Sequence, residues 1–145
     1  MSKSTTLEDK DNIGELLARY CFLLDNYHLR EFAALFTADG EWISRNGTGK
    51  GPDAIERLLR GLVPEPAPGR RRKHFTTNII INLAGGSATV FSNFLVVRDS
   101  EAGPTIAVAG TYHDVGVVTD RGWKFRSRRL SHDIAGESGL NTAPG

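Results

Sequence analysis

The sequence predicts an α+β fold in which helices from the first half of the chain cover an antiparallel sheet formed by the second half. Apolar residues recur at helical spacing up to about Gly61, and Thr- and Ile-rich segments separated by Gly-containing turns follow from Phe75. Helices first and strands afterwards favour this layered packing over alternating βαβ units. A curved sheet covered by helices leaves a cavity, where a small ligand would bind. The 145 residues fit one domain, residues 1–145.

The first helix is expected to begin near Thr6, because Thr6 and Asp9 resemble a capping box with a shortened acid. Its apolar stripe follows the spacing i, i+3, i+4, i+7 and i+11, and comprises Ile13, Leu16, Leu17, Tyr20 and Leu24. A second helix is expected over Leu29–Phe36. A third runs from Pro52, a favoured first helical position, to about Gly61.

Strand patterns occupy most of the remaining chain. A short strand is expected over Glu41–Arg45, followed by a Gly-rich turn at Asn46–Gly49, and Val63–Lys73 reads as a loop. Period-two alternation and Gly-containing turns then predict antiparallel strands over Phe75–Leu83, Ser87–Arg98, Thr105–Thr119 and Trp123–Ile134.

Composition excludes several classes of protein. A net charge of +1 gives no general attraction to nucleic acid, and no apolar run is long enough for a membrane span. The single Cys21 makes no internal disulfide, and the four histidines lack metal-ligand spacing, so we expect no metal and no cofactor. The polar N-terminus lacks the apolar stretch of a signal peptide, which predicts a cytoplasmic location.

Two polar residues stand at positions where chemistry is plausible. Asp25 lies at the edge of the apolar stripe of the first helix, and His74 opens a strand. Facing one another, they would form a general base whose tautomer the acid fixes. The alternatives are a solvent-facing carboxylate at a helix end and a structural or exposed histidine. The neighbouring basic run Arg70–Lys73 fits a solvated loop end, with a phosphate or nucleic-acid contact as its alternatives.

Four further residues are candidate walls of a cavity. Asn78 shares a strand face with His74 at period two, together with Thr76 and Ile80. Tyr20, Trp42 and Tyr112 are amphipathic aromatic residues that either line the cavity or belong to the plain core.

Short motifs in a fixed order resemble the SnoaL-like group of the nuclear transport factor 2-like superfamily. The resemblance extends over about residues 8–134, leaving polar tails on either side, and rests on I-x-x-L-x-x-x-Y-x-x-x-x-D (Ile13–Asp25), L-F-T-A-D-G-E-W (Leu35–Trp42), G-x-x-A-I (Gly51–Ile55), H-x-x-x-N (His74–Asn78), G-x-Y-x-D (Gly110–Asp114) and G-W-K-F-x-x-R (Gly122–Arg128). It implies a cone-shaped α+β barrel, with a curved antiparallel sheet wrapped by three helices.

The resemblance also implies a function. Several lyases of the superfamily pair an Asp at the end of the first helix with a His opening the strand after the third, which are Asp25 and His74 here. Tyr20 and Trp42 match pocket residues of the bile acid dehydratases and the dehydrochlorinase. Tyr20 is then a catalytic residue that donates a hydrogen bond to the leaving oxygen or to a developing enolate. We therefore expect a cofactor-independent lyase of dehydratase type acting on a small hydrophobic cyclic substrate. The alternatives are an isomerase or polyketide cyclase, or a non-catalytic ligand-binding or oxygenase-subunit-like protein.

Relatives of this kind commonly form dimers or trimers through the outer face of the sheet. Alternating apolar residues on the expected strand over Ser87–Arg98 suggest a similar homodimer or homotrimer here. These residues are Val90, Phe94 and Val96.

Overall fold

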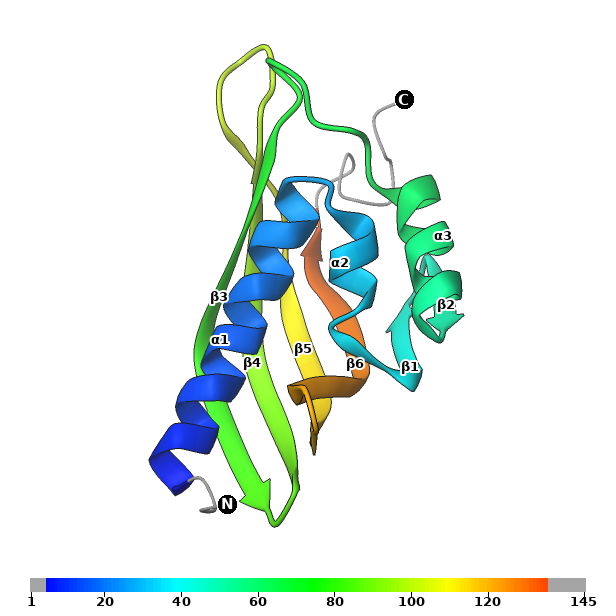
Figure 1. Ribbon diagram of the computed structural model, residues 1–145. Coiled ribbons are helices and arrows are strands. Elements are labelled where there is room, and N and C mark those ends of the chain that lie inside the picture. The colour runs from blue at the N-terminus through cyan, green and yellow to red at the C-terminus, as the bar shows by residue number, and fades with distance from the viewer. Residues whose placement is uncertain (1–4, 136–145) are drawn as a thin grey trace.

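The computed structural model describes residues 5–135 and places three helices on one face of a single six-stranded sheet (Figure 1). This arrangement confirms the α+β prediction. The elements are α1 (Thr6–Asp25), α2 (Leu29–Ala33), β1 (Phe36–Ser44), β2 (Gly47–Lys50), α3 (Pro52–Leu62), β3 (Arg72–Ala84), β4 (Ser87–Arg98), β5 (Thr105–Thr119) and β6 (Gly122–Ala135). No helix in this part of the chain is long and apolar enough to cross a membrane.

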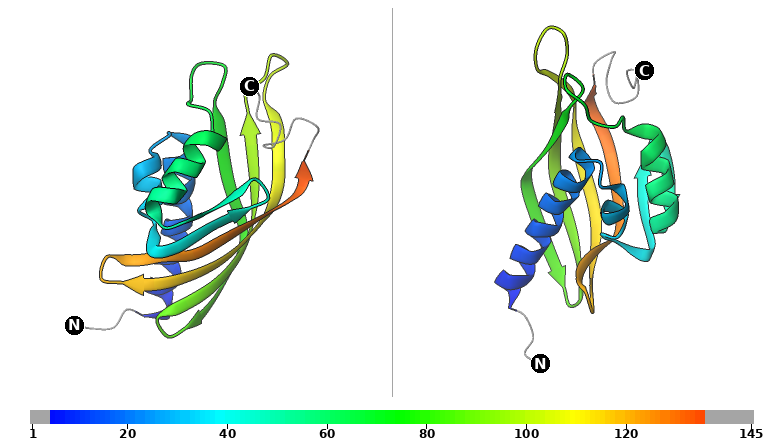
Figure 2. Two further views of the ribbon diagram at one scale, coloured as in Figure 1. Left: turned by 90° about the vertical axis from the view of Figure 1, so that its right-hand side faces the viewer. Right: turned by 45° about the horizontal axis from the view of Figure 1, so that its top comes forward.

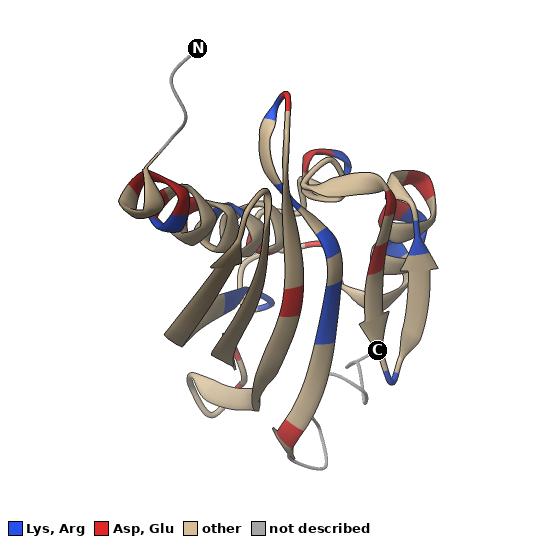
Figure 3. Ribbon diagram, turned by 90° about the horizontal axis from the view of Figure 1, so that it is seen from below, with Lys and Arg blue, Asp and Glu red and all other residues tan. Residues whose placement is uncertain are grey.

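The strands are ordered β2-β1-β6-β5-β4-β3, and the sheet curls around the helices (Figure 2). Neighbours from β3 to β6 are antiparallel, as expected. The sheet as a whole is mixed, because β1 runs parallel to β6. The sequence did not reveal this pairing, since it joins the first strand of the chain to the last. Charged residues of both signs share the helices, so neither sign dominates them (Figure 3).

Local boundaries differ from the expected ones for identifiable reasons. The N-cap of α1 is Thr5 rather than Thr6, and its box partner is Glu8: the two residues exchange backbone–side-chain hydrogen bonds of 2.6 and 3.1 Å. Helix α2 ends at Ala33 because the chain enters β1 at Phe36. The expected Gly-rich turn is largely the short strand β2.

A bulge in β3 reverses which residues face the helices. The register with β4 shifts between Thr77 and Ile80, and Asn78 has a φ of 55°, in the left-handed region that Asn tolerates. After the bulge, Ile81 and Leu83 pack against the core, and Ile80 is 60% exposed. The expected common face of His74, Asn78 and Ile80 is therefore interrupted.

The apolar residues of β4 that suggested an oligomer contact lie inside the molecule. Val90, Phe94 and Val96 are at most 3% exposed, because this face of the strand packs beneath the helices. Residues of the opposite parity, such as Phe91 at 41% exposure, occupy the outer face. The homodimer or homotrimer stays a prediction, and its contact would have to use that outer set.

A buried ion pair fills the middle of the cone. Arg128, with no exposed surface, donates two hydrogen bonds of 2.8 and 2.9 Å to the carboxylate of Asp114. Its guanidinium carbon lies 4.2 Å from the ring centre of Tyr20, 3.6 Å from that of Tyr112 and 4.6 Å from that of Phe125. Burial alone would lower the pKa of Arg128, but the charge and hydrogen bonds of Asp114 outweigh it and raise that pKa.

Breaking this pair should be costly. Asp114→Asn leaves the buried guanidinium without its counter-charge, so we expect the free energy of unfolding to fall by about 3–5 kcal/mol. Urea unfolding followed by tryptophan fluorescence measures the change. The exposed turn variant Asp120→Asn is the control and should stay within about 0.5 kcal/mol of the parent. Equal stability of the two variants would show that the pair contributes nothing.

Candidate functional site

Asp25 and His74 meet where the end of α1 packs against the start of β3. One carboxylate oxygen of Asp25 lies 2.6 Å from Nδ1 of His74, and the other accepts the backbone N–H of the same residue at 2.9 Å. Both side chains are at most 10% exposed. An ionised carboxylate only accepts hydrogen bonds, so Nδ1 carries the proton in the neutral ring and Nε2 presents its lone pair.

His74 lines a narrow cavity inside the cone, beneath α3. The cavity has a volume of about 40 Å³. Its walls combine aliphatic residues with five hydrogen-bonding side chains besides His74, and its residues are Tyr20, Leu24, Trp42, Asn46, Leu59, Leu62, Val63, Arg72, His74, Leu130 and His132. Ring-sized ligands need about 300–1000 Å³, so such a ligand requires some of these side chains to move.

Tyr20 and Trp42 form a hydrogen-bonded pair in this cavity. Trp42 Nε1 donates to the Tyr20 hydroxyl at 2.9 Å, and both side chains are buried. The phenol of Tyr20 therefore keeps its own proton available for a further acceptor. Burial raises the pKa of Tyr20 to about 12, although the nearby Arg128 charge and the Trp42 hydrogen bond act in the opposite direction.

Three polar residues in the cavity wall, Asn46, Arg72 and His132, escaped the sequence analysis as pocket residues. His132 lies on β6, and its pKa is lowered by burial and by the charge of Arg45, so its ring is neutral near pH 7. Arg72 stands two residues before His74 on β3 and belongs to the basic run that was read as a loop end. Period-two counting back from His74 would have placed Arg72 on the same strand face.

Two of the expected wall residues lie elsewhere. Asn78 is exposed at the bulge of β3 and receives a hydrogen bond from its neighbour Thr77. Tyr112 is fully buried and stacks on Phe94, with ring centres 4.4 Å apart, beneath the guanidinium of Arg128. Neither lines the cavity, because the bulge turns Asn78 away and the packed core encloses Tyr112.

The pair also borders a second hollow, between α1 and β3 on the other side of the helix. This groove has a volume of about 350 Å³, and its wall includes Cys21, Phe22 and Ile79 as well as the pair. Cys21 Sγ lies 3.3 Å from the hydroxyl of Thr76 there. Polar side chains suited to orienting a substrate converge on the inner cavity rather than on this groove, so we take the inner cavity as the candidate site.

Among residues 5–135, which the structure describes, no group of three or more His, Cys, Asp or Glu side chains is arranged so that it could hold a metal ion. The residues that line the inner cavity supply acid–base and hydrogen-bonding groups.

Comparison with known proteins identifies the family. The model of the SnoaL-like domain matches residues 5–129, and this chain belongs to that family. Its structure has the cone fold of the nuclear transport factor 2-like proteins. A search of the curated proteins found no match.

Solved structures with this fold include a protein of unknown function and a candidate dehydratase. Rv3472 from Mycobacterium tuberculosis, of unknown function, aligns with a TM-score of 0.81 and 26% identity over 97% of this chain and 87% of its own. A candidate scytalone dehydratase from Novosphingobium aromaticivorans aligns at 0.77 and 29%, over 90% and 88%. ActVI-ORFA from Streptomyces coelicolor aligns at 0.76 and 25%, over 86% and 96%.

The tautomer of His74 can be tested without a substrate. We expect long-range ¹H–¹⁵N spectra of the neutral ring to show a protonated Nδ1 and an unprotonated Nε2, because Asp25 accepts from Nδ1. In Asp25→Ala this preference should disappear. The exposed ring of His113 in the same spectra is the internal control. A protonated Nε2 in the parent would contradict the arrangement.

Tyrosine ionisation provides a second test. Burial also raises the pKa of Tyr112 well above 10, so a Tyr27→Phe variant should show no phenolate absorbance below a pH of about 11. Unfolded tyrosines ionise near pH 10, so between about pH 10 and 12 the folded state binds more protons than the unfolded state. Stability should therefore fall as pH rises through that window. Phenolate appearing near pH 10 in the folded variant would contradict this burial.

Proposed function

We propose that this protein is a cofactor-independent lyase that eliminates water, or a similar small leaving group, from a cyclic organic substrate. The observation that carries the proposal is the buried Asp25–His74 pair at the wall of a cavity that also contains a phenol and an indole. Membership of a family that includes dehydratases supports it.

In this reaction His74 is the general base. Its Nε2 takes a proton from a carbon next to an electron-withdrawing group, and the C–H electron pair becomes the new double bond as the C–O bond breaks. The imidazolium then returns the proton to the departing oxygen, which leaves as water and restores the neutral base. Asp25 is a positioning residue, because it holds the ring and stabilises its charged form.

Tyr20 would donate a hydrogen bond to the oxygen that gains negative charge. Its proton is retained because the pKa lies near 12, and Trp42 fixes the position of the phenol from the other side. Isomerisation and cyclisation would begin with the same proton abstraction, so the products decide between them.

The test combines a substrate screen with matched variants. Fused-ring β-hydroxy ketones would be screened for loss of one water by mass spectrometry. For a compound that reacts, His74→Asn should lower kcat by about 10²–10⁴-fold because the base is removed. Asp25→Asn should lower kcat more than it raises KM, since it acts through the ring. His113→Gln, an exposed histidine on β5, should react at the parental rate.

Other outcomes would correct the assignment. Unchanged product mass with deuterium taken up from D₂O would make the protein an isomerase or cyclase. Near-parental rates in both His74→Asn and Asp25→Asn would show that His74 is not the general base.

The small volume of the cavity favours a second candidate, a non-catalytic member of the fold. Side chains fill most of the cone, and the remaining cavity of about 40 Å³ leaves little room for a ligand. Failure of naphthalene-sized compounds to bind at millimolar concentration would favour this function over catalysis.

A further inference from the structure

Two arginines face each other at the open end of the β3–β4 hairpin. Arg72 on β3 is the direct partner of Arg98 on β4 in the antiparallel register. Opposite residues of such a pair have Cβ atoms about 4.5–5.5 Å apart and project from the same face of the sheet. Like charges directly opposite each other on neighbouring strands are destabilising, and an anion between them would offset the repulsion.

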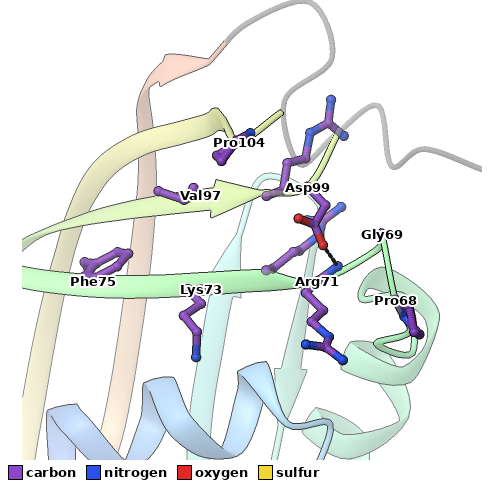
Figure 4. Close-up of a pocket in the computed structure, with 10 residues that line it drawn as sticks. Pro68, Gly69, Arg71, Lys73, Phe75, Val97, Asp99 and Pro104 are labelled. Carbon is purple, nitrogen blue, oxygen red and sulfur yellow. Dashed lines mark hydrogen bonds between the residues drawn. The ribbon is translucent and has the colours of Figure 1, made fainter. Parts of the chain in front are cut away.

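The two side chains lack counter-ions among residues 5–135. Arg72 is only 9% exposed, and its Nη1 has no hydrogen-bond partner; Nε of Arg98 is also buried and unpartnered. Neither arginine takes part in an ion pair within the described residues. The adjacent Asp99 pairs with neither arginine: its carboxylate accepts the backbone N–H of Arg71 at 3.0 Å (Figure 4), and no ion pair joins it to Arg72 or Arg98. A buried N–H donor of a charged group is destabilising when it has no partner, so these two nitrogen atoms indicate an external acceptor.

Burial and the charge of Arg98 both lower the pKa of Arg72. These surroundings therefore disfavour its charged form, and an anion beside Arg72 would act in the opposite direction.

The position of Arg72 connects this pair to the candidate active site. Arg72 lines the cavity that contains His74, and it also lines an adjoining hollow of about 340 Å³ whose wall includes Arg98, Pro64 and Ser100. A molecule in that hollow would place an acidic group against the arginines while its remaining atoms extend toward His74.

We propose that Arg72 and Arg98 bind an oxyanion group, such as a carboxylate, carried by the substrate whose ring lies beside His74. The substrate is then an organic acid rather than a neutral hydrophobic compound. The part of this inference that concerns the ring rests on the proposed function; the anion site does not. Guanidinium groups suit this task because their N–H donors match the two oxygens of a carboxylate.

The test compares two probes of nearly equal shape, 2-naphthoate and the uncharged 2-naphthamide, by titration calorimetry. We expect the parent to bind the acid at least about 10-fold more tightly than the amide, because charge-assisted hydrogen bonds add to its affinity. Arg72→Gln and Arg98→Gln should each weaken naphthoate about 10- to 100-fold and leave naphthamide unchanged. Arg126→Gln, which changes an exposed arginine on β6, should bind both like the parent.

Three results would overturn the proposal: equal affinity of the parent for the two probes, an equal loss in Arg126→Gln, or displacement of naphthoate by inorganic phosphate at the same concentration. The last would show a site for free oxyanions rather than for a substrate. Folding is not an obstacle, since removal of an unpaired buried charge should leave the melting temperature equal or higher. His74→Asn should retain the preference for naphthoate, so failure of the lyase mechanism and failure of the anion site are separable.

Discussion

The contact between Asp25 and His74 determines how the candidate site is built. One carboxylate accepts both the backbone and the ring N–H of a single residue, so it fixes the end of α1 against the start of β3 and orients the imidazole at the same time. A buried carboxylate requires such hydrogen bonds, because a buried charge without partners strongly destabilises the fold. The same interaction therefore closes this side of the cone and prepares a base, and a change in either residue affects packing and chemistry together.

The interior of the cone is organised by a second buried charge. Arg128 occupies the centre, paired with Asp114 and enclosed by aromatic rings, and Tyr20 links this centre to the cavity through its hydroxyl. Rigid filling of this kind leaves a cavity of about 40 Å³, which limits what binds without rearrangement. It also keeps water away from the Tyr20 phenol, which makes its hydrogen bond stronger than in solvent. Tight packing around Arg128 thus accounts both for the small volume of the cavity and for the strength of the hydrogen bonds in its wall.

Local patterns in the sequence predicted the helices and the long antiparallel strands, and the family resemblance implied that Asp25 meets His74. The local patterns failed where a bulge changes which residues of a strand face the helices, and where strands far apart in the sequence pair. The bulge at Asn78 breaks period-two counting, so that residue leaves the pocket face. The parallel pairing of β1 with β6 joins opposite ends of the chain and leaves no local trace. The sequence analysis missed Arg72 for another reason. A run of basic residues normally indicates a solvent-exposed segment, and Arg72 is buried only because β3 begins there and turns its side chain inward.

The order of residues along β3 relates the two halves of the proposed site. Arg72 and His74 are separated by one residue on a strand, so their backbones are about 7 Å apart and their side chains project from one face. An acid held by the arginine would therefore bring the carbons nearest to its carboxylate beside the imidazole. The proton removed would be the one on a carbon at that distance that is also next to a ketone, because a carboxylate alone does little to acidify its neighbouring C–H bonds. Anchoring the acid and choosing the proton to be removed would then be one geometric requirement, met by two neighbouring positions of the same strand.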